Sequence, residues 1–117
     1  MPLLQVFTSA HPADEHKRAQ LLKSLSALVA RLLSKPESYV MISLAARTEM
    51  SFAGSGAPAC YAELKNVGTL SPGQAKNLSK VLCQELSAGF GVPAERIYIE
   101  FTNADGAMWG WNGGTFG

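Results

Sequence analysis

The sequence carries almost no excess charge of either sign. Ten Lys and Arg residues stand against nine Asp and Glu residues, which leaves a formal net charge of +1 at pH 7. A chain so nearly neutral offers no strong attraction to nucleic acid or to an anionic membrane, so neither is expected as a partner. No apolar run approaches the roughly 20 residues of a membrane span, and the first residues do not have the pattern of a signal peptide.

Cysteine and histidine are also scarce. Cys60 and Cys83 form neither a CxxC motif nor a metal-ligand cluster. We therefore expect both to be reduced side chains of a cytoplasmic protein. His11 and His16 flank the start of an expected helix in a polar stretch, a setting that does not favour a metal or catalytic role. No metal and no cofactor are predicted.

Apolar residues, in contrast, are plentiful enough to build a core. They make up 47% of the chain against 16% charged residues, which is typical of an ordered protein. The length of 117 residues suits one ordinary domain, so residues 1–117 are predicted to form a single domain.

The pattern predicts two β-α-β units, one after the other. Strands are expected at residues 2–8, 38–46, 59–68 and 96–102, and a helix joins the two members of each pair. The first helix is indicated by apolar residues at helical spacing and ends before Pro36. The second begins with Ser71 as N-cap, Pro72 at the first helical position and Gln74 as partner in a capping box.

Right-handed crossovers would place both helices on one face of a single four-stranded sheet, which is an α/β (α+β) fold. The other face is then uncovered. Its expected residues, such as Tyr98, Glu100 and Thr102, are too apolar for ordinary solvated surface and too polar for a dry core. Two explanations fit this face: a homo-oligomer in which sheets pack together, or a ligand site between subunits.

Five motifs occur in order along nearly the whole chain. They are MP at 1–2, KPESY at 35–39, NVG at 66–68, RIYIEF at 96–101 and GWNGGTF at 110–116. Together they resemble the macrophage migration inhibitory factor (MIF) family of the tautomerase superfamily, and the last motif is the most specific. The resemblance implies a homotrimeric barrel that catalyses keto–enol tautomerisation of phenylpyruvate-like or dopachrome-like compounds. The animal members also act as secreted signals.

By this resemblance, Pro2 is the catalytic base once Met1 is removed. A base works best with a pKa near the working pH. A free α-amino group starts at about 7.7–8.0, whereas lysine starts at about 10.4, and burial or a nearby cation lowers the value further. Taken alone, Pro2 also fits a residue that merely begins an edge strand.

The resemblance assigns substrate binding to further residues. Lys35 would hold the substrate carboxylate and lower the pKa of Pro2, although its position also suits a lysine that stabilises a helix C-terminus. Val67 would contact the substrate through its backbone. The other expected pocket residues are Leu3, Tyr98, Glu100, Trp109 and Phe116, with Met41 and Trp111 as further candidates. Packing alone could also explain the aromatic residues.

Three departures from the family pattern matter. Glu100 replaces an asparagine, and a carboxylate near Pro2 would raise the pKa of the base, unless Glu100 points at Lys35 or is partly protonated. Trp109 replaces a smaller residue and should narrow the pocket. The stretch PACYAEL lacks a CxxC motif, so a thiol–disulfide oxidoreductase activity is not expected.

The sequence therefore predicts a cytoplasmic homotrimeric tautomerase that acts on a small aromatic keto acid. The alternative is a MIF-like signalling or protein-binding molecule with weak or vestigial activity and a receptor as partner. Secretion in that case would need a non-standard route.

Overall fold

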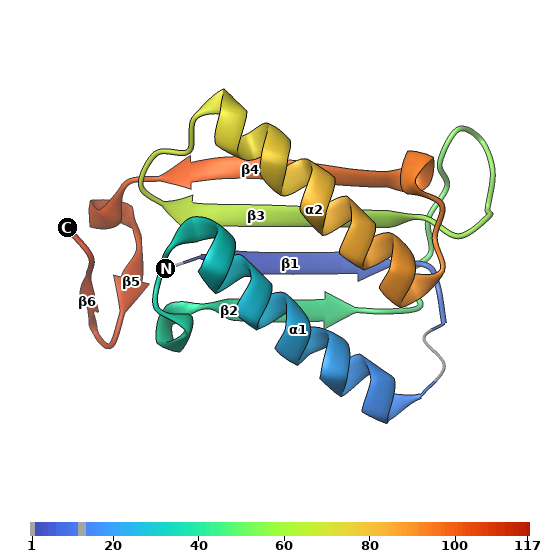
Figure 1. Ribbon diagram of the computed structural model, residues 1–117, viewed down its shortest axis with the longest axis horizontal. Helices are drawn as coiled ribbons and strands as arrows, with labels where there is room; N and C mark the ends of the chain where they lie inside the picture. The colour runs from blue at the N-terminus through green and yellow to red at the C-terminus, as the bar shows by residue number, and fades with distance from the viewer. Residues whose placement is uncertain (1, 12–13) are drawn as a thin grey trace.

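Four strands form one mixed sheet in the computed structural model, which describes residues 2–11 and 14–117 (Figure 1). The strands are β1 (Leu3–Thr8), β2 (Met41–Ala45), β3 (Cys60–Val67) and β4 (Ile97–Ala104), in the order β2-β1-β3-β4. β1 runs parallel to β2, and β3 runs parallel to β4. The two central strands, β1 and β3, pair antiparallel, so the two β-α-β units meet at the centre of the sheet.

Two long helices cover a single face of this sheet, as Figure 1 shows. The helix α1 (Glu15–Leu33) joins β1 to β2, and α2 (Pro72–Phe90) joins β3 to β4. Each parallel pair needs such a crossover, because a tight turn cannot return the chain to the same direction. The predicted fold class, with both helices on one face, is confirmed. Neither of these helices has the length of apolar sequence needed to cross a membrane.

The ends of both helices follow the chemistry of their cap residues. The side chain of Asp14 accepts a hydrogen bond from the Lys17 backbone N–H, at 2.8 Å, at the start of α1. Ser71 and Gln74 form the predicted capping box at the start of α2. Ser34 and Gly91 take left-handed conformations at the two C-termini and end the helices there.

The core lies between the helices and the sheet. Side chains of β1 and β3 alternate between buried and half-buried, so each strand gives one face to the core. The buried members include Leu4, Val6, Leu64, Leu25, Val29, Leu78, Leu82 and Leu86. On the opposite face no described helix covers the sheet, and Tyr98 there is 65% exposed. The predicted uncovered face is therefore present in the single chain.

The second strand is shorter than predicted. Residues 37–39 form a 3₁₀ turn (η1, Glu37–Tyr39), in which the Tyr39 N–H donates to the Pro36 carbonyl and the Val40 N–H to the Glu37 carbonyl. These bonds curl the chain directly after Pro36, so pairing with β1 starts only at Met41. The prediction of a strand from residue 38 was wrong, because local turn bonds outcompete the apolar pattern.

The C-terminal tail folds back over one end of the sheet. It contains a 3₁₀ turn (η3, Gly106–Met108) and a small hairpin of β5 (Gly110–Trp111) and β6 (Gly114–Thr115). Loops and short strands were expected here. In Figure 1 this hairpin lies at the same end of the sheet as the start of β1.

Candidate active site

A hollow of about 230 Å³ opens at the end of the sheet where β1 begins. Three segments that are distant in sequence line it: the start of β1, the η1 turn with the start of β2, and the C-terminal hairpin. The lining residues are Pro2, Leu3, Ser38, Tyr39, Val40, Met41, Trp109, Gly110, Trp111 and Phe116. A mainly apolar hollow of this size suits a ligand built on a single ring. We call it the Pro2 pocket.

Three aromatic rings pack together as one wall of the Pro2 pocket. The Tyr39 ring meets the rings of Trp111 and Phe116 edge-on, with centroids 5.4 Å and 5.7 Å away. The Trp111 and Phe116 rings stack nearly parallel at 5.6 Å. Such pairs hold one another in fixed orientations. The wall is therefore a rigid apolar surface contributed by η1 and the hairpin together.

Pro2 is held firmly at the base of this pocket. Its ring is fully buried, and its carbonyl accepts a hydrogen bond from the Met41 N–H at 3.0 Å. This bond extends the pairing of β1 with β2 by one residue beyond the strand. The predicted removal of Met1 concerns a residue outside the described part of the chain. The direction of the Pro2 nitrogen is nevertheless set by the strand that follows it.

Lys35 reaches the same end of the sheet from the end of α1. Its ammonium group donates hydrogen bonds to the Asn66 side-chain oxygen at 2.7 Å and to the Val67 carbonyl at 2.5 Å. An ammonium group has three N–H donors, so one is left for a ligand. Burial lowers the pKa of Lys35 from its ordinary value.

The register of the central strands brings Lys35 toward Pro2. Leu3 pairs with Lys65, so Asn66, the next residue of β3, lies beside Pro2. A second hollow, of about 550 Å³, adjoins this point and is lined by Val67, Gly68 and other residues. Phe116 lines both hollows. Pro2, Lys35, Val67 and Phe116 are therefore brought to one end of the sheet, together with Leu3 and Trp109.

Asn66 is the residue that the sequence reasoning missed. Its side chain is only 3% exposed, on the core-facing side of β3, and its oxygen is a partner of Lys35. The signal was available: an asparagine at a buried position of an otherwise apolar strand needs a hydrogen-bond partner. Tyr39 was likewise expected only as part of a strand, and its place in the aromatic wall follows from the η1 turn.

Tyr98 and Glu100 do not lie in the Pro2 pocket of their own chain. Tyr98 pairs with Tyr61, which in turn pairs with Phe7. The stretch from Pro2 to Phe7 spans roughly 17 Å of extended strand at about 3.4 Å per residue. The Tyr98 ring instead packs against Phe52, with centroids 4.8 Å apart. Both predicted pocket residues are on the uncovered face, on a strand at the edge of the sheet.

Glu100 is part of a small polar cluster on that uncovered face. Its carboxylate accepts hydrogen bonds from the Tyr61 hydroxyl and the Thr102 hydroxyl, each at 2.9 Å. The bond from Tyr61 and the bond from Thr102 lower the pKa of Glu100. Within one chain Glu100 therefore lies away from Lys35, and its hydrogen bonds favour the carboxylate form. Across residues 2–11 and 14–117, no group of three or more His, Cys, Asp or Glu side chains is placed to hold a metal.

The family model described as Macrophage migration inhibitory factor (MIF) matches residues 1–117. The chain belongs to the MIF family. A MIF homologue from Trichinella spiralis is 37% identical over 116 residues, which cover 99% of this chain and 100% of that protein. MIF from Mus musculus is 32% identical over 116 residues and covers 99% of both proteins.

Solved structures give the same family. The crystal structure of a MIF homologue from Prochlorococcus marinus superposes with a TM-score of 0.91 at 41% identity, covering 98% of this chain and 99% of that one. The MIF family is part of the tautomerase superfamily. The predicted family is thus confirmed, while the roles of Pro2, Lys35 and the pocket residues stay predictions.

Proposed function

We propose that this chain is a keto–enol tautomerase of small aromatic 2-keto acids such as phenylpyruvate, with Pro2 as base after removal of Met1. The observation that carries the proposal is the meeting of three features at one end of the sheet. These are a buried proline at the start of β1, a lysine with one free ammonium proton, and an aromatic pocket of about 230 Å³.

The chemistry needs a base and a cation beside one another. The Pro2 nitrogen takes a proton from the carbon next to the ketone, and the electron pair of that C–H bond becomes the C=C bond of the enol. The ketone oxygen takes up the negative charge and then receives the proton from the Pro2 ammonium. Lys35 holds the substrate carboxylate and stabilises the negative charge that develops on the ketone oxygen. Such electrostatic stabilisation is usually the largest single contribution to lowering the barrier.

Lys35 also favours an uncharged Pro2 nitrogen. A neighbouring ammonium group disfavours a second positive charge, so it lowers the pKa of the α-amino group from about 7.7–8.0. An amine with a pKa near or below neutrality is largely unprotonated at pH 7 and can accept a proton. The ring further limits the directions in which the nitrogen lone pair can point.

The working form is proposed to be a homotrimer, as the family resemblance implies. Two features of the single chain support self-association: the sheet face without a covering helix, and the placement of β2 and β4 as its edges. In such an assembly Tyr98 and Glu100 would be contributed to the Pro2 pocket by a neighbouring copy, since their own chain holds them far from Pro2. The cytoplasm is the proposed location, because Cys60 and Cys83 are both free thiols.

The deciding experiment follows the enol–keto conversion of phenylpyruvate and of its 4-hydroxy analogue. Wild type is compared with Pro2→Ala and Pro2→Gly, and the intact mass of each protein shows whether Met1 is absent. Loss of the ring-held base should lower kcat/KM by about 10²-fold or more. Pro93→Ala is the matched control, since this exposed proline lies in the turn after α2, at the other end of the sheet.

Three outcomes would overturn the proposal. Equal rates for wild type and both Pro2 variants would reject Pro2 as the base. A protein that retains Met1 and still turns over phenylpyruvate would do the same. Wild type without any tautomerase activity would instead favour the signalling interpretation.

A further inference from the structure

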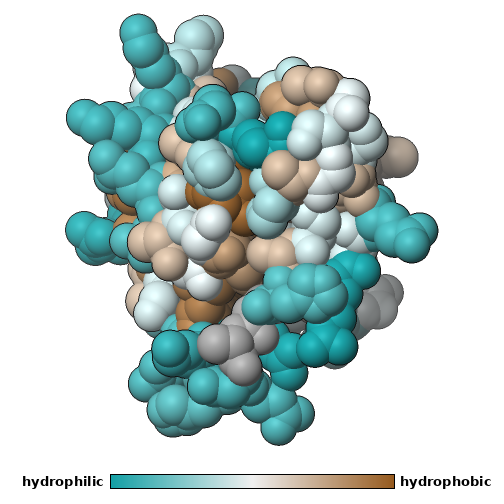
Figure 2. Space-filling model, turned by 90° about the vertical axis from the view of Figure 1, so that its right-hand side faces the viewer, coloured by the Kyte–Doolittle hydropathy of each residue, from teal (hydrophilic) through white to brown (hydrophobic). Residues whose placement is uncertain are grey.

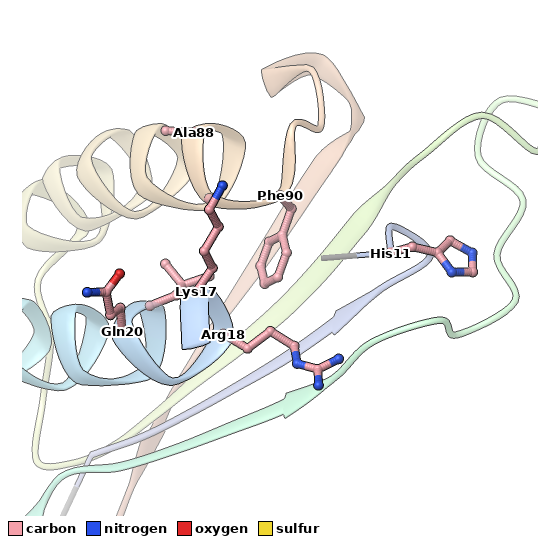
Figure 3. A pocket seen from close by; sticks show the side chains of 8 residues that line it. His11, Lys17, Arg18, Gln20, Ala88 and Phe90 are labelled. Atoms are coloured by element: carbon pink, nitrogen blue, oxygen red, sulfur yellow. The ribbon is translucent and has the colours of Figure 1, made fainter. Parts of the chain in front are cut away.

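A third hollow, of about 500 Å³, lies where α1 begins and α2 ends. Its lining residues are His11, Lys17, Arg18, Gln20, Leu21, Ala88, Gly89 and Phe90. Figure 3 shows Lys17 and Arg18 leaving the first turn of α1 on different sides of the Phe90 ring, with His11 coming from the segment after β1. The 19-residue α1 separates this hollow from Lys35, roughly 28 Å at about 1.5 Å per residue.

The charged side chains that line this hollow are both positive, while Asp14 and Glu15 lie nearby at the start of α1. Lys17 and Arg18 carry positive charge, His11 adds a donor, and no carboxylate is among the described lining residues. The nearby Asp14 carboxylate is engaged as the N-cap of α1. Because the whole chain has a net charge of only +1, this accumulation is local and does not reflect a basic composition.

Both cations are free of protein partners in the described part of the chain. The only ion pair found there joins Lys65 to Glu63, far from this hollow. The Arg18 guanidinium group is on a half-buried residue and donates to no described acceptor, so its planar fork is unused. A guanidinium fork of this kind matches the paired oxygens of a phosphate or carboxylate.

The floor of the hollow is apolar, and two helices pack closely beside it. Phe90 is 9% exposed and points down between the two helices in Figure 3. Figure 2, which faces this end of the molecule, shows apolar surface next to a dense group of hydrophilic side chains. At Gly89 a Cβ atom would come within 2.9 Å of the Leu21 side chain. The lack of a side chain at Gly89 therefore allows Leu21 of α1 to pack closely against the end of α2.

We propose that this hollow is a binding site for a small organic phosphate, a doubly charged phosphate monoester on an apolar group. Arg18 holds the phosphate oxygens through its guanidinium fork, Lys17 adds positive charge from the other side of the Phe90 ring, and the apolar group lies against Phe90 and Leu21. We call it the α1–α2 site. It shares no residue with the Pro2 pocket, so its occupancy does not depend on the tautomerase reaction.

The test is an NMR titration of the full chain with phenyl phosphate at low ionic strength. The titration uses the Lys35→Ala variant, because it lacks the cation that could bind phenyl phosphate beside Pro2. Saturable amide shifts are expected at residues 17–21 and 88–90. Arg18→Gln should weaken the affinity by about tenfold or more, because a charge-assisted pair is lost. Lys23→Gln, on the same helix but outside the site, should change it less than about twofold.

Inorganic phosphate and benzyl alcohol test the two halves of the ligand separately. Each should bind at least about tenfold more weakly than phenyl phosphate. Inorganic phosphate binding as tightly would overturn the apolar half of the proposal. Shifts that do not saturate, or equal losses in Arg18→Gln and Lys23→Gln, would overturn the site. If Lys35→Ala does not fold, the same titration of wild type separates the two sites by the amides that shift.

Discussion

Lys35 keeps a single ammonium proton for a ligand because Asn66 and Val67 accept the other two. The Asn66 amide is buried, so it cannot exchange this partner for bulk water at no cost. Gly68 completes the arrangement: a Cβ atom there would lie 3.9 Å from the Lys35 nitrogen, and the backbone φ of +120° is one that other residues rarely adopt. The position of the Lys35 ammonium group thus depends on Asn66, a buried neighbour on β3.

Replacing Asn66 should therefore weaken substrate binding more than turnover. In Asn66→Ala the ammonium group loses one fixed acceptor and samples other directions, so we expect KM for phenylpyruvate to rise by about tenfold with a smaller change in kcat. Steady-state kinetics measure both constants. Asn77→Ala, an exposed asparagine of α2, is the control. A fall in kcat with unchanged KM would contradict a positioning role.

The pH dependence of activity should show Lys35 on its alkaline side. Burial lowers the pKa of Lys35, so its ammonium group loses its proton at a lower pH than that of a fully exposed lysine. As pH rises through that pKa, Lys35 loses the positive charge that pairs with the substrate carboxylate, and kcat/KM falls. In Lys35→Arg the guanidinium keeps its charge, and the alkaline fall should vanish or move well upward. A pH–rate profile of both proteins checks this, and an identical alkaline limb in the variant would rule Lys35 out as its origin.

At the scale of elements, the loop after β2 is held by the side chain of Arg96, which lies in the turn directly before β4. The Arg96 guanidinium group donates to the carbonyls of Phe52, Ser55, Ala57 and Pro58. It also lies over the Phe52 ring, 5.1 Å from the centroid. Since Phe52 packs against Tyr98, the loop and the exposed face of β4 are stabilised together.

Arg96→Lys should loosen this loop while leaving the fold intact. An ammonium group has only three N–H donors and cannot bond all four carbonyls, so we expect a loss of about 1–3 kcal/mol in the free energy of unfolding. Limited proteolysis within residues 47–58 should become faster. Thermal unfolding and peptide mapping measure the two effects, with Arg31→Lys on an exposed part of α1 as the control. Equal stability of both variants would show that these bonds contribute little.

Elements with strong local chemistry were predictable from sequence. The capping box at Ser71 and the helix end near Pro36 follow from side-chain hydrogen bonding and backbone restriction, and both appear as expected. The η1 turn was missed, because it leads directly into the apolar run of β2 and its turn bonds involve only backbone groups. The sequence motifs also identified Pro2, Lys35 and the hairpin aromatics as one group, without revealing that Asn66 links Lys35 to β3.

At the scale of the whole molecule, sequence motifs group residues along the chain but do not show which of them lie together in space. Tyr98 and Glu100 occur in a motif of the same chain as Pro2, yet strand register keeps them apart. Register depends on long-range pairing that no local pattern encodes. The uncovered face, in contrast, could be read from the alternation of residues in the predicted strands.

The assembly should be measurable directly. We expect light scattering after size exclusion to give about three times the 12.4 kDa mass of one chain at micromolar concentration. The reason is that an exposed mixed face and two free edges favour association over solvation. A fully active monomer would show that Tyr98 and Glu100 of a neighbouring copy are not needed.

Pro2 and Phe116 line the same hollow although they come from opposite ends of the sequence. Any affinity tag or fluorescent fusion, at either terminus, would therefore project from the mouth of the Pro2 pocket, and an amino-terminal one would also keep the proline nitrogen as an amide. Inactivity of a tagged preparation would then be caused by the tag and would not be a property of the protein itself. A label inserted in the turn after α2, at the other end of the sheet, avoids both effects.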